Sequence, residues 1–207
     1  MHALAIMEAR KYVWILGSPL CGKTTSSALI AGSEEHGRTV EHVSVGKLIR
    51  ETTEHRDVIN ECFLQGKLIP PKLCFDILKN HLDNLSANIK LVILDGYPRS
   101  RICFETWRSH NMPWPSLILH YKCSVETLRC RLAMRSGSES RIDDTLEIFQ
   151  KRYQGYCLET LELLNFLEGK DEAPPCKTID ADRILPEVLD KVHYYLCRYD
   201  LCGCLTS

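Results

Sequence analysis

The chain has 207 residues, of which 44% are hydrophobic and 26% charged, and its formal net charge at pH 7 is −1. This composition is typical of a folded globular protein with one core, and the near-neutral charge argues against a broad nucleic-acid or membrane-surface footprint. No hydrophobic run approaches the roughly 20 residues that a membrane-spanning helix needs, and the acidic start is too short for a secretory signal.

Hydrophobic runs that are typical of strands alternate with segments of helical periodicity, which predicts an α/β protein with a parallel sheet. The expected strands cover residues 11–17, 39–44, 89–95, 116–122 and 176–180. The expected helices cover residues 23–36, 46–54, 57–65, 71–84, 101–109, 124–135, 143–168 and 184–198. We expect the longest of these helices to break or kink near Gly155.

The first strand leads into GSPLCGKT, residues 17–24, which fits the pattern G-x-x-x-x-G-K-[ST]. The order of strand, glycine-rich loop, lysine and helix is the one that a phosphate-binding loop requires. In such a loop, backbone N–H groups surround phosphate oxygens and the helix N-terminus adds partial positive charge. Lys23 would reach the β/γ-phosphates, and a hydroxyl of Thr24 or Thr25 would contact Mg²⁺ or phosphate. An ordinary glycine-rich turn is the plainer alternative.

A second informative site lies where the strand at 89–95 ends in Asp95. A carboxylate at this position can hold Mg²⁺, usually through water, although it can equally cap a helix or turn. Gly96-Tyr97-Pro98-Arg99 follows directly. An arginine presented just after a tight turn can bind a phosphate through two N–H donors, so Arg99 favours the phosphate-site interpretation.

Several segments, in matching order, resemble the family of adenylate kinases and UMP/CMP kinases. They are GSPLCGKTT (17–25), HVSVGKLIR (42–50), GKLIP (66–70), DGYPR (95–99), RLAMR (131–135), SRIDD (140–144) and Arg152. The resemblance covers roughly residues 11–196 and implies the P-loop NTPase fold. That fold has a five-stranded parallel sheet flanked by helices, a helical insert that binds a nucleoside monophosphate (NMP), and a lid.

The resemblance implies one nucleoside monophosphate kinase domain over residues 1–207. Its parts would be a core at about 10–43, 73–134 and 146–198, an NMP-binding insert at about 44–72, a short lid at about 135–145 and a tail at 199–207. Only five residues separate Arg135 from Arg141. That length leaves no room for a four-cysteine zinc lid, so no zinc is expected there.

Residue roles follow from the resemblance position by position. ATP would be bound by Pro19, Leu20, Cys21, Gly22, Lys23, Thr24, Thr25 and Arg135. The monophosphate would be bound by Ser44, Val45, Gly46, Arg50, Leu68, Ile69, Gly96, Arg99, Cys103, Arg141 and Arg152. The catalytic residues would be Lys23, Arg99, Arg135, Arg141 and Arg152, which hold two phosphates in line and neutralise the moving phosphoryl. Mg²⁺ would arrive with ATP beside Thr24 and Asp95, and Asp143 and Asp144 would orient arginines or Mg²⁺-bound water.

The chain also departs from the family at several of these positions. Leu20 and Thr24 stand where the family usually has glycine, and Val45 stands where it usually has threonine. Cys103 replaces the glutamine of adenylate kinases or the asparagine of the pyrimidine enzymes, and a thiol is a poor hydrogen-bonding partner. A site that has lost these base-reading groups should discriminate less between bases, so we expect relaxed or altered acceptor choice.

The expected function is transfer of the γ-phosphoryl of ATP to an NMP, with AMP favoured (ATP + AMP = 2 ADP). Trp107 keeps a UMP/CMP kinase open, because pyrimidine-type members often have tryptophan there, although a residue of the helical core fits equally well. A catalytically weak ATP-binding nucleotide sensor is the other alternative, and DGYPR argues against a small-metabolite P-loop kinase. We expect a cytoplasmic monomer with no nucleic-acid partner and no obligate protein partner.

Eleven cysteines are scattered along the chain without a C-x-x-C pair, which favours reduced thiols over a disulfide framework. The last four residues, CLTS, fit a prenylation signal at Cys204 with Cys202 as a second lipid acceptor, and this would give membrane contact. A frayed terminus with incidental thiols is the plainer interpretation. His193, Cys197, Cys202 and Cys204 could also bind a metal ion, but their irregular spacing makes the motif weak.

Overall fold

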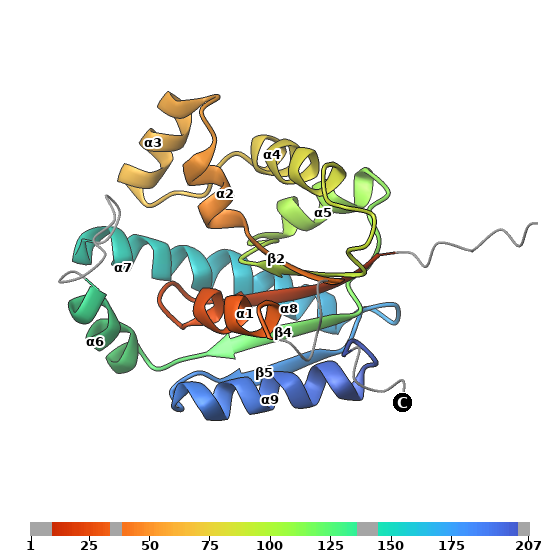
Figure 1. Ribbon diagram of the computed structural model, residues 1–207. Coiled ribbons are helices and arrows are strands. Elements are labelled where there is room, and N and C mark those ends of the chain that lie inside the picture. Colours follow the sequence, from red (N-terminus) through yellow and green to blue (C-terminus); the bar gives the residue numbers. More distant parts are fainter. Residues whose placement is uncertain (1–9, 34–38, 136–144, 203–207) are drawn as a thin grey trace, which may run out of the picture.

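The structure is a computed structural model that describes residues 10–33, 39–135 and 145–202 (Figure 1). Five strands form one parallel sheet in the order β2-β3-β1-β4-β5. The strands are β1 (Lys11–Gly17), β2 (Val40–Ser44), β3 (Leu91–Asp95), β4 (Leu117–Lys122) and β5 (Cys176–Asp180). Each lies within two residues of a predicted strand, so the α/β prediction is confirmed.

Helices cover both faces of the sheet. They are α1 (Lys23–Ala31), α2 (Val45–Glu51), α3 (Arg56–Gln65), α4 (Pro71–Asp83), α5 (Arg101–Ser109), α6 (Val125–Arg135), α7 (Leu146–Gly155), α8 (Leu161–Glu168) and α9 (Leu185–Arg198). In Figure 1, α2 and α3 lie above the sheet at the upper left, and α9 runs along the bottom of the view beneath β5. Among the described residues no helix is both long and hydrophobic enough to cross a membrane.

Strand β1 shows how the sequence builds two cores from one run of hydrophobic residues. Successive side chains of a strand point to opposite faces, and a parallel sheet buries both faces. Tyr12, Trp14 and Leu16 therefore pack with α4, α5 and α8, while Val13 and Ile15 pack with α9 on the other face. All five side chains are at most 5% exposed.

Trp107 belongs to the first of these cores. Its side chain is fully buried, its ring meets the ring of Trp14 edge-on at 5.9 Å, and its indole N–H donates to the carbonyl of Pro113 at 2.8 Å. The interpretation of Trp107 as a residue of the helical core is thus confirmed, and its burial does not bear on the choice of acceptor base.

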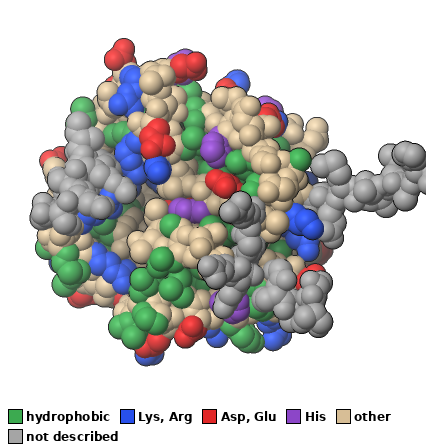
Figure 2. Space-filling model, in the orientation of Figure 1, with side chains coloured by type: hydrophobic (Ala, Val, Ile, Leu, Met, Phe, Trp, Pro, Cys, Tyr) green, Lys and Arg blue, Asp and Glu red, His purple; other side chains and the backbone are tan. Residues whose placement is uncertain are grey.

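The surface carries no dominant charge on the face that Figure 2 shows, where basic, acidic and hydrophobic side chains are interspersed. This agrees with the net charge of −1. In the described part of the chain no disulfide joins the cysteines, several of which, such as Cys21, Cys74 and Cys103, are buried.

The break predicted near Gly155 takes the form of a π-helical turn, η2 (Tyr156–Thr160), between α7 and α8. His120 of β4 is 5% exposed, and its Nε2 lies 2.7 Å from the hydroxyl of Tyr156 in this turn. Burial, with a smaller effect of the charge on Lys122, lowers the pKa of His120 to about 4. Burial also raises the pKa of Tyr156, so a neutral imidazole and a neutral hydroxyl share this hydrogen bond.

This arrangement predicts acid sensitivity that depends on His120. As the pH falls below about 6.5, the unfolded chain takes up a proton at this histidine and the native state does not, so stability is lost until about pH 4. The loss should reach roughly 3 kcal/mol. In urea unfolding at pH 7 and pH 4.5, His120→Gln should lose less stability than the wild type by about that amount. Equal losses in both proteins would contradict the buried neutral state.

Candidate active site

The site lies at the carboxyl ends of β1 and β3, which are neighbours in the sheet. Ligands of open α/β sheets bind at this edge. The two strand ends are tied together where the backbone N–H of Gly96 donates to the carbonyl of Ile15 at 3.0 Å. The loop at 17–24 and the DGYPR segment, far apart in sequence, are therefore built side by side.

The loop begins at Gly17, where the chain passes very close to β4. A β-carbon at Gly17 would lie 2.8 Å from the carbonyl oxygen of Tyr121 and 2.9 Å from Sγ of Cys21. Only glycine fits this approach. The loop then closes onto α1, which begins at Lys23.

Leu20 takes a backbone conformation that L-residues rarely adopt, with φ at 65°. The left-handed region costs a residue with a β-carbon about 1–2 kcal/mol, and this is the position where the family usually has glycine. The leucine side chain is partly buried and packs against the core on the α9 face of the sheet, which offsets part of that cost. The structure therefore shows how the loop tolerates leucine.

Lys23 is folded over the loop. Its ammonium donates to the carbonyl of Ser18 at 2.8 Å, and its Cε lies 3.7 Å from where a β-carbon of Gly96 would be. The positive charge is thus held between the loop and the segment that follows β3.

Asp95 forms the floor of the site and is 3% exposed. The hydroxyl of Thr24 donates to its Oδ2 at 2.5 Å, and Nε2 of His42 lies 3.6 Å from the same oxygen. Burial alone would raise the pKa of Asp95, but His42, the charge on Lys23 and the Thr24 hydroxyl together hold it below the ordinary value. The carboxylate is therefore ionised at neutral pH.

Thr24, which replaces a usual glycine, thus has a defined partner in Asp95. His42 was missed by the sequence predictions. It lies on β2 beside β3, two residues before the strand end where Ser44 is paired with Asp95. His42 could be identified only from the order of the strands in the sheet, and the sequence alone does not reveal that order.

Two hydrogen bonds hold Arg99 in place, one made by its side chain and one by its backbone carbonyl. Its Nε donates to the carbonyl of Gly96 at 2.8 Å, and the hydroxyl of Thr160 in η2 donates to the carbonyl of Arg99 at 2.8 Å. Gly96 has φ at 77°, and a β-carbon there would lie 3.1 Å from Nη2 of Arg99. Glycine is required for both reasons, and the absence of a side chain lets Arg99 and Lys23 both approach this point.

Arg50 approaches Arg99 at a second glycine, Gly46. A β-carbon at Gly46 would lie 3.5 Å from Nη2 of Arg50 and 3.6 Å from Nη2 of Arg99. The guanidinium of Arg50 also lies 5.8 Å from the ring centre of Phe63 on α3. Two predicted phosphate-binding arginines thus converge in the space that the missing side chain leaves open.

The predicted base-reading residues are buried. Val45 is 2% exposed, Cys103 is 4% exposed, and both pack in the core on the α4–α5 face with Ile69, while Leu68 is more exposed. Burial, followed by the nearby Cys103 thiol, raises the pKa of Cys74 to about 12. No hydrogen-bonding side chain of the kind usual at positions 45 and 103 is therefore presented to a base.

The remaining predicted residues lie around this centre or outside the described residues. Ser44 immediately precedes α2, Pro19 is in the loop, and Thr25 is exposed on α1. Arg135 ends α6 and Arg152 lies in α7. Arg141, Asp143 and Asp144, with residues 136–144 of the predicted lid, lie outside the described residues.

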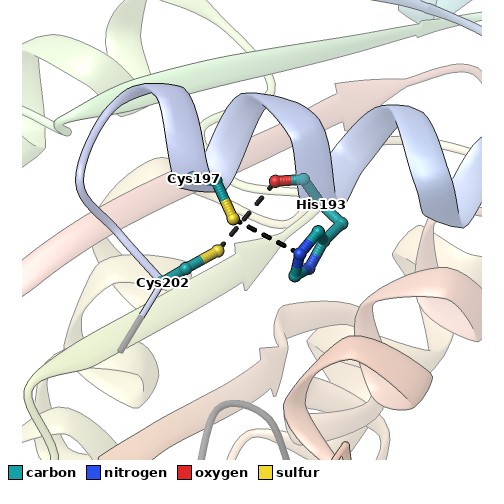
Figure 3. Close-up of side chains that lie close together, drawn as sticks. All are labelled: His193, Cys197 and Cys202. Carbon is teal, nitrogen blue, oxygen red and sulfur yellow. Dashed lines mark hydrogen bonds between the residues drawn. The ribbon is translucent and has the colours of Figure 1, made fainter. Parts of the chain in front are cut away.

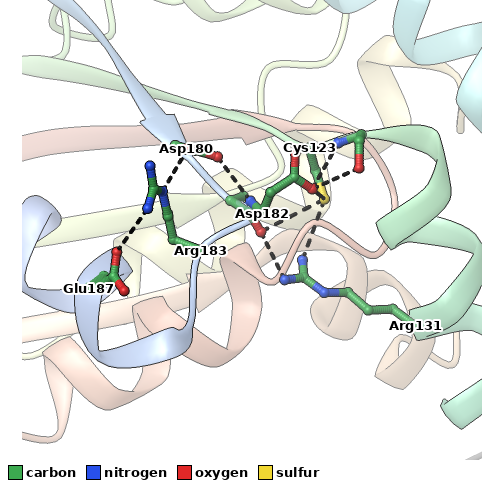
Figure 4. Close-up of polar contacts among 8 residues, drawn as sticks. Cys123, Arg131, Asp180, Asp182, Arg183 and Glu187 are labelled. Carbon is green, nitrogen blue, oxygen red and sulfur yellow. Dashed lines mark hydrogen bonds and ion pairs between the residues drawn. The ribbon is translucent and has the colours of Figure 1, made fainter.

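Arg131 of α6 is a further cation beside the loop that the predictions omitted. Its guanidinium donates to the carbonyl of Leu20 at 3.4 Å and to that of Ala181, after β5, at 2.8 Å. Figure 4 shows Arg131 and Asp182 converging on Cys123. Hydrogen bonds from Thr127 and Ser124 lower the pKa of Asp182 to about 2, so its carboxylate is ionised and accepts hydrogen bonds from the segment that follows β4.

Comparison with known proteins gives a consistent result. The sequence model of the family described as adenylate kinase matches residues 15–172. UMP-CMP kinase 3 of Oryza sativa subsp. japonica is 28% identical over 191 residues, which cover 90% of this chain and 86% of that protein. Adenylate kinase of Nitratiruptor sp. is 27% identical over 197 residues, which cover 91% and 96%.

A longer relative matches as well. Adenylate kinase isoenzyme 5 of Homo sapiens is 28% identical over 166 residues, which cover 78% of this chain but 29% of that protein. The chain therefore spans less than a third of the human relative. Proteins named for adenine and for pyrimidine acceptors are similar to this chain to nearly the same degree.

Proposed function

Because the chain belongs to the adenylate kinase family and is a nucleoside monophosphate kinase, we propose that it transfers the γ-phosphoryl of ATP to AMP, with relaxed selectivity for the acceptor base. Its parallel sheet is that of the P-loop NTPase fold. The observation that carries the proposal is that the side chains of Lys23 and Arg99 both approach Gly96. A donor phosphate on the loop and an acceptor phosphate on Arg99 would then meet end to end.

On the donor side, the loop amides and Lys23 would hold the phosphates of ATP. In this structure the ammonium of Lys23 is bound by the carbonyl of Ser18, and a phosphate oxygen would take over that contact. The lysine would then balance the negative charge that spreads over the moving phosphoryl group. Phosphoryl transfer needs this positioning and charge balance more than covalent help from the protein.

The residues at the floor of the site suit the Mg²⁺ that the family uses with ATP. Magnesium prefers oxygen ligands and keeps several waters, and the site offers an ionised carboxylate on Asp95 and a hydroxyl on Thr24. Those two residues would hold the ion, directly or through water, and it would supply further charge neutralisation to the phosphates.

On the acceptor side, Arg50 and Arg99 would bind the phosphate of the monophosphate around Gly46. Charge-assisted bonds from two planar guanidinium groups fix both the position and the orientation of a phosphate. Arg135, Arg141 and Arg152 would complete the site when the lid and insert close and exclude water.

The experiment that tests this function is coupled-enzyme turnover with Mg·ATP against AMP, CMP, UMP, GMP and dAMP in parallel. We expect AMP to be the best acceptor and the others to differ from it by less than the large factors that hydrogen-bonded base recognition provides. Strong preference for CMP or UMP would replace the AMP assignment by the UMP/CMP kinase alternative. Silence on all five, with ATP binding intact, would favour a nucleotide sensor.

Restoring a base-reading group at position 103 should sharpen the choice of acceptor. In Cys103→Gln the ratio of kcat/KM for AMP over CMP should rise roughly tenfold, the effect of about one good hydrogen bond. Cys103→Ala is the matched control, since it removes the thiol without adding a donor, and its ratio should stay at the wild-type value. Cys103 is buried, so a thermal melt must first show that the glutamine variant folds. An unchanged ratio in a folded variant would refute this role of position 103.

A further inference from the structure

Three metal-ligating side chains meet at the end of α9. His193 and Cys197 are four residues apart on the helix and therefore share one face. Cys202 comes from the chain just after the helix (Figure 3). One ligand atom from each residue lies within 4.8 Å of the others, and Sγ of Cys197 is 3.3 Å from Nε2 of His193.

The backbone places Cys202 there through a defined turn. Asp200 has φ at 52°, its N–H donates to the carbonyl of Cys197 at 3.1 Å, and the N–H of Leu201 donates to the carbonyl of Leu196 at 2.8 Å. This pair of bonds is the Schellman arrangement, which turns the chain back over the last turn of a helix. The ammonium of Lys11 donates to the carbonyl of Asp200 at 3.2 Å and fastens the turn to the start of β1.

The packing after the turn fixes the thiol as well. Leu201 is 6% exposed and Cys202 is 5% exposed, and both belong to the core between α9 and the sheet. The spacing of five residues between Cys197 and Cys202 looks irregular in the sequence, but the turn makes it compact. A buried thiol is thereby aimed at a helix face that already carries an imidazole and a second thiol.

These atoms suit a tetrahedral zinc ion. With Zn–S near 2.3 Å and Zn–N near 2.0–2.1 Å, ligand atoms around one zinc lie roughly 3.5–3.8 Å apart. Small rotations of side chains separated by no more than 4.8 Å reach those distances. Two thiolates also balance the charge of one divalent cation, so the loaded site would be neutral, which suits the buried Cys202 beside the partly buried His193 and Cys197.

We propose that His193, Cys197 and Cys202 form a Zn²⁺ site whose fourth ligand is water. On binding, each thiol gives its proton to solvent and its sulfur donates an electron pair to the ion, as does one nitrogen of the neutral imidazole. The ion would join the turn after α9 to the helix itself and so stabilise the fold. This site is separate from the phosphate loop, because Lys11 starts β1 at the amino edge of the sheet while the loop follows its carboxyl end.

The test uses the full chain, purified with reductant, stripped with chelator and titrated with Co²⁺, a spectroscopic substitute for Zn²⁺. We expect one Co²⁺ per chain, near-ultraviolet absorption of thiolate-to-cobalt charge transfer, and displacement by Zn²⁺. Zinc at about a hundredfold excess over its Kd should raise the Tm by roughly 5 °C or more. Phosphoryl transfer should keep its rate whether or not the ion is bound.

His193→Ala, Cys197→Ala and Cys202→Ala should each weaken Co²⁺ binding on the order of a hundredfold. Cys130→Ala, on the exposed face of α6, is the matched control and should bind as the wild type does. If Cys202→Ala fails to fold, His193→Ala still tests the metal site, because His193 is only half-buried.

Several results would overturn the site. One is absence of thiolate absorption in the reduced wild type, and another is full binding by the folded His193→Ala variant. Loss of binding in Cys204→Ala together with retention in Cys202→Ala would move the ligand role to a different thiol. Binding of Cu⁺ but not of Co²⁺ or Zn²⁺ would refute the choice of ion. If the purified protein has a disulfide between Cys197 and Cys202 and the reduced protein binds no cation, the pair would belong to redox chemistry instead.

Discussion

Replacing Lys23 by alanine should lower kcat/KM for phosphoryl transfer at least about a thousandfold and leave the protein folded. The ammonium is the donor-side charge nearest to Gly96, where the two phosphates are proposed to meet. In this structure it donates a hydrogen bond to the carbonyl of Ser18 at 2.8 Å and a longer, weaker one to Sγ of Cys21 at 3.8 Å. Losing the bond to Ser18 should cost about 1 kcal/mol of stability, which a thermal melt would register as a shift of a few degrees.

The matched control is Lys72→Ala. Lys72 lies on α4 with its side chain 78% exposed, and its partner is Asp76 one helical turn away. Exposed pairs of this kind contribute little, so the variant should match the wild type in both turnover and melting. Turnover near the wild-type level in Lys23→Ala would contradict the donor role, whereas a large drop in both lysine variants would point to a general charge effect.

Arg99→Ala should reduce kcat/KM at least about a hundredfold, mainly through KM for the monophosphate. Arg99 shares the space beside Gly46 with Arg50, and its backbone is held from η2 by Thr160. The lost interaction is therefore with the acceptor, and ATP binding measured without acceptor should stay within about twofold of wild type.

Arg101→Ala separates this effect from the loss of any arginine in the segment. Arg101 is two residues further along, at the start of α5, and contacts Glu105 at 2.9 Å and the ring of Phe166 at 4.1 Å. Its loss should cost at most about 1 kcal/mol of stability and leave KM unchanged. A KM effect in Arg101→Ala as large as in Arg99→Ala would argue against a specific phosphate contact.

The central part of the sheet could be predicted closely from sequence because β3, β1 and β4 are buried on both faces. The hydrophobic run from Tyr12 to Leu16 is uninterrupted, so its ends are easy to locate. Gly17 follows this run directly, and Asp95 follows the corresponding run in β3. The site residues on β1 and β3 followed from their place at strand ends. Their pairing, such as Thr24 with Asp95, required the strand order, which hydrophobic patterns do not encode.

Other parts of the site depended on contacts between distant segments. His42 reaches Asp95 only because β2 lies beside β3, and Arg131 reaches Leu20 across 111 positions of the chain. The turn that returns Cys202 to α9 uses Asp200 in a conformation usually taken by glycine, so no glycine marked it. Local conformational propensities of the residues do not predict such positions, because the tertiary structure determines them.

The π-helical turn between α7 and α8 also sets which way the second half of the helix faces. A π turn accommodates one residue more than an α turn, and each residue of an α-helix rotates the side chains by about 100°. The π turn absorbs its extra residue, so that Leu163, Leu164 and Leu167 are the buried residues of α8. A family member shortened by one residue within 156–160 could therefore close this turn as an ordinary α turn and still present Leu163, Leu164 and Leu167 to the core, whereas the present length without the π turn would rotate them away.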